Sequence, residues 1–214
     1  MYTIDIELVM NKLKEKRKIF VSESDFKFEI AWIIKEEYPN AKIRLEYCPS
    51  FDLSMHIDIL VIIDSKWIPI ELKYKTKGCI KNIGNEIFYL KNHSAKDVNC
   101  YHYLKDIQRI EKIRDNVPEF YEGYTIFITN ELSYTKKPSK KNCVYKQFSL
   151  EDSAIKTGTM NWSEKASNGT KKNCENPIHL TGKYIINWNN YSKIDNTNTG
   201  TFMYLINKIT QKKN

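Results

Sequence analysis

The chain has 214 residues, of which 41% are hydrophobic and 28% are charged, and this composition fits one globular domain with a sizeable core. Its formal net charge of +8 suits a polyanionic partner. The sequence has no run of 18 apolar residues, so it predicts no membrane-spanning helix. Five scattered cysteines without a Cys-x-x-Cys pair predict neither a disulfide framework nor a zinc site. The N-terminus has no basic-then-apolar signal pattern, so we expect a cytoplasmic protein.

Two helices are predicted before the first strand. Residues 3–18 carry apolar residues at helical spacing and end in a basic run, which suits a helix C-terminus. Residues 22–37 begin at capping serines and stop before Pro39. Glu29 lies in the apolar stripe of this second helix, where a carboxylate is costly unless it is paired or binds a metal. The alternative is that Glu29 lies at the margin of the stripe and reaches water.

The most informative stretch is residues 56–75, which indicates two apolar strands around a short polar turn. With the turn at residues 65–66, Lys73 lies opposite Asp58 and Glu71 becomes the diagonal neighbour of Asp58. The three charges then share one end of one face, and the other face is apolar. Two carboxylates at this spacing can hold a hard divalent cation such as Mg²⁺. The alternative is an edge hairpin in which Asp58 and Lys73 form an ordinary cross-strand ion pair.

Further elements complete a mixed sheet around this hairpin. Residues 42–48 alternate between apolar and polar and predict a half-buried strand. Residues 97–115 predict a helix that crosses over to a strand at residues 123–130. Between the hairpin and this helix, two glycines interrupt the pattern, so residues 79–96 are expected to form a mobile loop with one short turn.

The chain becomes more polar in its C-terminal part. Residues 133–177 hold nine lysines and four acids, so we expect a basic loop or insertion that is partly disordered. Residues 178–191 predict a closing strand, and residues 201–209 a short last helix. The expected organisation is a core at 1–132, the basic segment, and a closing strand and C-terminal helix of the same domain at 178–214.

Asp58 is followed after twelve residues by Glu71, a leucine and Lys73, and this pattern resembles the PD-(D/E)XK motif of a nuclease superfamily with the restriction-endonuclease-like fold. Ile57 stands where the family usually has a proline before the first acid. The resemblance covers roughly residues 20–130. It implies an α/β (α+β) fold, in which a central mixed sheet of about four to five strands is flanked by helices.

The resemblance implies a metal-dependent nuclease, either an endonuclease or an exonuclease, that hydrolyses phosphodiester bonds. Its expected substrate is DNA, and its expected cofactor is Mg²⁺, which Mn²⁺ could replace. Asp58 and Glu71 would bind the metal, and Glu29 matches the position of a helix glutamate that often joins them. Lys73 would stabilise the transition state or activate water, and the sequence leaves both roles open.

Polar residues on the predicted helix at 97–115 are candidates to support such a site. Asp106, Gln108 and Arg109 match the helix on which some members of the superfamily carry supporting residues. The simpler alternative is a solvated helix face with an ion pair between residues three apart.

Lysines gather directly after the motif, since residues 72–96 contain six lysines and one acid. Lys75, Lys77 and Lys81 are therefore predicted to contact phosphates of nucleic acid, with a solvated loop as the alternative. A non-catalytic nucleic-acid- or partner-binding module on the same scaffold is the second functional hypothesis. A homodimer is also open, because enzymes that cut both strands often pair two copies.

Overall fold

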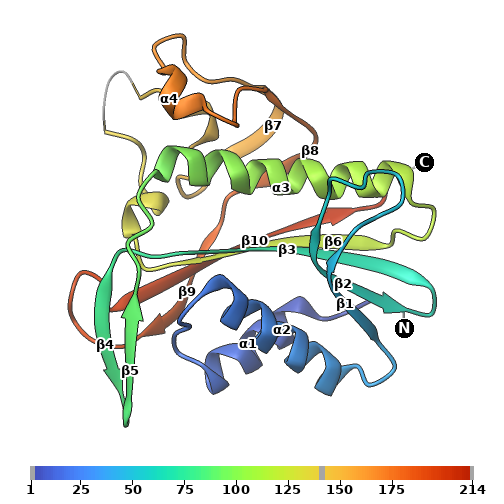
Figure 1. Cartoon of the computed structure of the whole chain (residues 1–214), viewed down its shortest axis with the longest axis horizontal. Helices are drawn as coiled ribbons and strands as arrows, with labels where there is room; N and C mark the ends of the chain where they lie inside the picture. Colours follow the sequence, from blue (N-terminus) through green and yellow to red (C-terminus); the bar gives the residue numbers. More distant parts are fainter. Residues whose placement is uncertain (1–2, 140–142, 213–214) are drawn as a thin grey trace.

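The computed structural model describes residues 3–139 and 143–212, and its central feature is one six-stranded mixed sheet (Figure 1). Neighbouring strands are antiparallel except β3 and β6, which run parallel. The mixed α/β class predicted from the sequence is confirmed, with one strand more than expected. From one edge to the other, the strands are β1 (Lys42–Tyr47), β2 (Ile57–Ile63), β3 (Lys66–Lys75), β6 (Glu122–Thr129), β10 (Thr201–Thr210) and β9 (Trp188–Lys193).

Helices cover both faces of the sheet (Figure 1). Helices α1 (Ile6–Lys16) and α2 (Glu23–Glu37) lie on one face, and α3 (Lys96–Asn116) lies on the other. The side chain of Ser22 caps α2, as predicted, by accepting a hydrogen bond from the third residue of the helix. Each face buries its own apolar core, which explains the continuous apolar runs of the central strands. No helix in the described ranges is long and apolar enough to cross a membrane.

The turn between β2 and β3 lies one residue earlier than predicted. It consists of Asp64 and Ser65, whose φ angles of 47° and 65° are the positive values that a type I′ hairpin turn requires. The paired strands therefore place Ile59 opposite Ile70. Continued by one residue, this register puts Asp58 opposite Glu71.

The predicted register of the hairpin is therefore wrong by two residues. In this continuation Glu71, and not Lys73, is the residue opposite Asp58, and Lys73 is the diagonal one. The paired ladder ends at Ile59, and the two strands separate at Asp58. Ile57 then packs in the core on the α3 side, whereas Ile59 packs on the side of α1 and α2. The separation leaves room for polar side chains between the strands.

The segment expected to be a mobile loop forms a hairpin instead. Strands β4 (Cys79–Ile83) and β5 (Glu86–Leu90) pair antiparallel around a tight turn in which Gly84 has a φ of 57°. Phe88 and Leu90 anchor the hairpin in the core beneath α1 and α2. The glycines therefore mark the turn and the entry to the hairpin, not a break in structure.

The basic segment expected at residues 133–177 is folded over its described residues, and residues 140–142 of it lie outside the described ranges. Its residues pack against α3, and Trp162 stacks on Tyr101 of that helix with ring centroids 5.7 Å apart. Aromatic side chains thus form part of the core of this polar segment. The elements are η1 (Leu132–Thr135), η2 (Lys146–Phe148), β7 (Ile155–Met160) and α4 (Asn168–Lys171), and β7 pairs with β8 (Ile178–Ile185).

The last segment is a strand, not the predicted helix. Residues 201–210 form β10, which pairs with β6 from Met203 to Thr210 and with β9 on its other side. Phe202, Leu205 and Ile209 have helical spacing, but they are buried within a central strand of the sheet. Pairing with two neighbours overrides the local pattern here.

Candidate active site

The polar cluster predicted at Asp58 exists where β2 and β3 separate. Asp58 Oδ2 accepts a hydrogen bond from the backbone N–H of Leu72 at 2.8 Å, and Oδ1 lies 2.7 Å from Lys27 Nζ of α2. Burial raises the pKa of Asp58, but the hydrogen bonds from Lys27 and Leu72 outweigh it, and the pKa is lowered. Asp58 is therefore a carboxylate at neutral pH.

Glu71 is a fully buried acid with an unsatisfied oxygen. Its side chain is 1% exposed, and Oε1 has no hydrogen-bond partner among the described residues. Arg109 Nη2 lies 3.2 Å away as an ion-pair partner, but it donates its hydrogen bond to the carbonyl oxygen of His56. Burial, followed by repulsion from Asp106, raises the pKa of Glu71 well above its ordinary value.

Lys73 is held by an acid on the helix above it. Its Nζ lies 2.5 Å from Asp106 Oδ2. Burial lowers the pKa of Lys73, but Asp106 and Glu71 raise it by more, so the net pKa lies above its usual range. Lys73 is thus a fixed positive charge at neutral pH, and this state suits electrostatic stabilisation better than general-base catalysis.

The structure brings two of the three candidate supporting residues to the cluster. Asp106 and Arg109 lie next to each other on α3, with Oδ1 and Nη1 3.4 Å apart. Asp106 is only 4% exposed, and burial raises its pKa although Lys73 and Arg109 lower it. The alternative of a solvated helix face is therefore wrong for Asp106. Gln108 points away, because its Nε2 donates to the carbonyl oxygen of His179 on β8 at 3.2 Å.

Glu29 does not join the cluster. It forms an ion pair with Arg17 at 3.4 Å, beside the C-terminus of α1. Residues 27 and 29 point about 200° apart on a helix, so the side of α2 that faces Asp58 carries Lys27. Glu23, one turn before Lys27, accepts a hydrogen bond from the backbone N–H of Tyr74 at 2.9 Å. Glu23 and Lys27 are spaced by one helical turn, so they lie on the same side of α2. This spacing was the sequence signal for the side of α2 that faces Asp58, whereas the apolar stripe pointed to Glu29.

The three lysines predicted to contact nucleic acid differ in their surroundings. Lys81 is 4% exposed and its Nζ lies 2.8 Å from Asp195, so its interpretation as a phosphate contact is wrong. Lys75 is half-buried and pairs with Glu23 at 2.8 Å. Lys77 is exposed. Only Lys77 presents its charge to solvent in the way that the prediction requires.

The cluster is electrically balanced without a metal. Asp58 is paired with Lys27, Asp106 with Lys73, and Glu71 with Arg109. The described ranges contain no group of three or more His, Cys, Asp and Glu side chains that could hold a metal ion. The unsatisfied oxygen of Glu71 is the feature that fits a divalent cation, since carboxylate oxygens are its preferred ligands. The charged members are the acids Asp58, Glu71 and Asp106 and the cations Lys27, Lys73 and Arg109.

No protein-family model matches the chain, and no curated protein is significantly similar to it. The functional argument therefore depends on the fold and on the chemistry of this cluster.

Proposed function

We propose that the protein is a metal-dependent nuclease with a restriction-endonuclease-like fold, which hydrolyses phosphodiester bonds of nucleic acid, with DNA as its expected substrate. One observation carries the proposal: Glu71 is fully buried beside Asp58 and Lys73, and one of its oxygens has no hydrogen-bond partner in the described chain. Arg109 Nη2 balances the charge of this oxygen as an ion-pair partner at 3.2 Å, but burial of a carboxylate that lacks a hydrogen bond still costs on the order of several kcal/mol. Such a cost is typical of residues retained for function.

Asp58 and Glu71 would hold the metal, and both come from adjacent strands at the point where the strands separate. A bound Mg²⁺, or Mn²⁺ in its place, would polarise the phosphoryl oxygens and lower the pKa of a water molecule. The hydrogen bond from Leu72 N to Oδ2 fixes the orientation of Asp58, and a metal ion would take the place of Lys27 at Oδ1. Asp58 therefore supplies negative charge at a defined place, and a metal ion beside Glu71 would favour the ionised form of that acid.

Lys73 would stabilise the negative charge that develops on the phosphate in the transition state. The ion pair with Asp106 fixes the position of Lys73 Nζ, and the negative charges of Asp106 and Glu71 keep Lys73 protonated. A charge that is already oriented needs little reorganisation when the reaction occurs. We therefore assign electrostatic stabilisation to Lys73, and not proton abstraction.

A cleavage assay tests the proposal. Purified protein is incubated with supercoiled plasmid, single-stranded DNA and RNA in Mg²⁺, in Mn²⁺ and in EDTA. We expect metal-dependent cleavage that is lost in Asp58→Asn, Glu71→Gln and Lys73→Gln. The control is Glu86→Gln, which neutralises an exposed acid on β5. Cleavage by Glu71→Gln at the wild-type rate would remove the residue on which the proposal depends.

A non-catalytic nucleic-acid-binding module is the second candidate, and the charge balance of the cluster favours it. Lys73 and Glu71 are both engaged by residues of α3. In this case the wild-type protein would bind nucleic acid with a steep salt dependence, and no divalent metal would produce turnover.

A further inference from the structure

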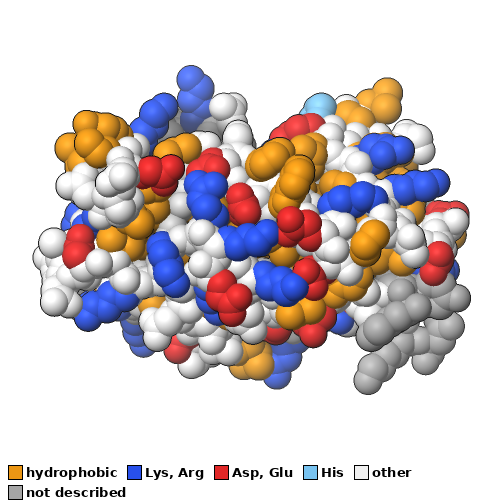
Figure 2. Space-filling model, turned by 90° about the horizontal axis from the view of Figure 1, so that it is seen from below, with side chains coloured by type: hydrophobic (Ala, Val, Ile, Leu, Met, Phe, Trp, Pro, Cys, Tyr) orange, Lys and Arg blue, Asp and Glu red, His pale blue; other side chains and the backbone are white. Residues whose placement is uncertain are grey.

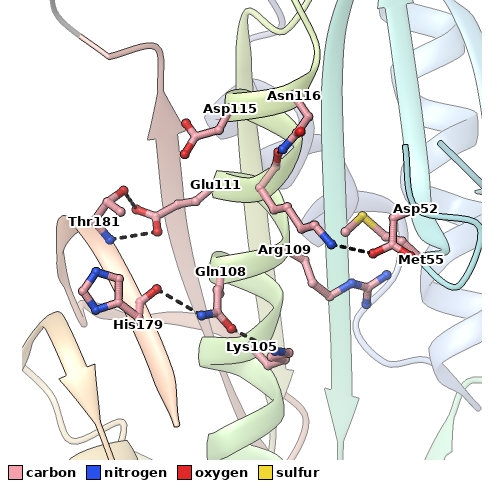
Figure 3. A pocket seen from close by; sticks show the side chains of 11 residues that line it. Asp52, Met55, Lys105, Gln108, Arg109, Glu111, Asp115, Asn116, His179 and Thr181 are labelled. Atoms are coloured by element: carbon pink, nitrogen blue, oxygen red, sulfur yellow. Dashed lines mark hydrogen bonds and ion pairs between the residues drawn. The ribbon is translucent and has the colours of Figure 1, made fainter. Parts of the chain in front are cut away.

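A pocket of about 410 Å³ lies on the outer side of α3, next to the candidate active site (Figure 3). The helix forms its floor, β8 forms one wall, and the loop before β2 forms the other. Arg109 lines the pocket and is also the ion-pair partner of Glu71 at 3.2 Å. The pocket and the active-site cluster are therefore separated by a single side chain.

Three cations form a row along this floor. Lys105, Arg109 and Lys112 are spaced by four and three residues, so they lie on one side of α3 and all line the pocket. Burial, and then the charges of Lys112 and Arg109, lower the pKa of Lys105. An anion in the pocket would relieve this repulsion.

The acids that line the pocket do not neutralise Lys105. Asp52 pairs with Lys112 at 2.7 Å, and Asp115 pairs with Arg114 at 2.9 Å. Glu111 points to the opposite wall, where it accepts hydrogen bonds from Thr181 (Figure 3).

Lys105 itself has a neutral partner. Its Nζ donates to Gln108 Oε1 at 2.9 Å, and this amide oxygen carries no formal charge. The pocket thus contains a half-buried positive charge that no carboxylate of the pocket balances.

We infer that this pocket binds a backbone phosphate of nucleic acid, with Lys105 and Arg109 as the cations that attract it. The inference rests on the proposed function and names where the substrate strand is held. A phosphate seated here lies beside Arg109, and hence next to the reacting phosphate at Asp58 and Glu71. The same phosphate chemistry could come from a free phosphate ion, and the experiment separates the two sources.

The opposite side of the molecule offers a matched control. Figure 2 views the protein from the side of α1 and α2, where basic side chains are interspersed with acidic ones. Lys16 of α1, for example, forms an ion pair with Glu36 of α2. Lys18 is exposed in the loop between these helices. Lys18→Gln lowers the net charge by the same one unit as Lys105→Gln, so it controls for non-specific attraction.

The test measures binding of a fluorescently labelled DNA duplex in EDTA at a series of salt concentrations. We expect Lys105→Gln to weaken binding and to reduce the slope of log affinity against log salt by about 0.9, the value for one lost phosphate contact. Lys105→Arg keeps the charge and should restore the slope, and Lys18→Gln should leave it unchanged. Thermal unfolding of each variant confirms that it is folded.

Two outcomes would overturn the inference. The first is a Lys105→Gln slope equal to that of Lys18→Gln. The second is calorimetric binding of inorganic phosphate that depends on Lys105 while duplex binding does not, which would assign the pocket to a small phosphate ligand. Both readouts are independent of cleavage, so failure of the nuclease proposal in the Mg²⁺ assay remains distinguishable from failure of this site.

Discussion

The guanidinium of Arg109 reaches from α3 to the buried carboxylate of Glu71, with 3.2 Å between Nη2 and Oε1. A side chain of the protein thus provides the positive charge beside an acid that we assign to a metal. Arg109 also bonds to the carbonyl oxygen of His56 and pairs with Asp106, so it connects α3 with the start of β2. Removal of this cation should affect stability and metal binding in opposite directions.

The first prediction concerns Arg109→Gln. In EDTA at neutral pH, this change leaves the buried Glu71 without its ion-pair partner, so the free energy of unfolding should fall by about 3 kcal/mol. A ligand that binds only the native state adds stability. Mg²⁺ or Mn²⁺ should therefore stabilise the variant more than the wild type, because Arg109 no longer competes with the metal ion for Glu71. Urea unfolding with and without metal measures both effects.

The control for this prediction is Lys12→Gln. Lys12 forms a partly exposed ion pair with Glu37, so its loss should change stability by less than about 1 kcal/mol. Equal destabilisation by the two substitutions would contradict the role of Arg109.

The second prediction concerns Asp106, a positioning residue for Lys73. Asp106→Asn should lower the cleavage rate about 10- to 100-fold, as is typical when a partner that orients a functional group is lost. Because Asp106 raises the pKa of Lys73, the alkaline decline of the rate should also move to lower pH. Asp97→Asn, on the same helix, should leave the pH–rate profile unchanged. A fall in rate without a shift of the profile would indicate a structural role only.

The third prediction concerns pH and the ion pair between Asp195 and Lys81, whose Oδ2 and Nζ are 2.8 Å apart. Hydrogen bonds from Lys81 and Thr197 lower the pKa of Asp195 from 3.8 to about 2. Since this pKa is lower in the folded state, the pair stabilises the protein above about pH 3.8, and the stabilisation disappears as the pH falls toward about 2.

Thermal unfolding of the wild type and of Asp195→Asn tests this dependence. The wild type should melt at the higher temperature at neutral pH, and the two midpoints should converge between about pH 3.8 and about pH 2. A difference that persists below this range would show that the ionised carboxylate is not its cause.

The fourth prediction concerns Glu111 of α3, which accepts hydrogen bonds from β8. It is 3% exposed and accepts hydrogen bonds from Thr181 N, Gly182 N and the hydroxyl of Tyr184, at 2.9, 2.7 and 2.8 Å. Glu111→Ala leaves these donors without a partner, and we expect a loss of about 3 kcal/mol. Limited proteolysis should cut the variant earlier within residues 150–185. Glu119→Ala, an exposed acid in the loop before β6, should be cut like the wild type.

The elements with strong local signals could be predicted from the sequence. Helix α2 was expected at 22–37 and spans Glu23–Glu37, because a serine cap and a following proline mark its ends. Strand β6 was expected at 123–130 and spans Glu122–Thr129, since its run is apolar on both faces. In these cases the local sequence and the tertiary environment favour the same structure.

The pairing details of the site could not be predicted in the same way. Three consecutive polar residues, 64–66, follow the apolar run of β2, and the sequence does not show that Asp64 and Ser65 are the two with positive φ. The partner of Glu71 was also hidden, because it depends on how α3 is rotated against the sheet. Arg109 was named as a supporting candidate, but its contact with Glu71 required the fold.

Strand β6 is buried along its entire length between β3 and β10. It ends at Thr129, whereas β10 begins at Thr201. A ribosome that adds about 5–20 residues per second needs on the order of several seconds to cover this interval. During that time β6 has an apolar edge without its later neighbour, and such an edge is a template for aggregation. The protein is therefore prone to aggregate during its synthesis, before β10 has paired with β6, and not in its native state.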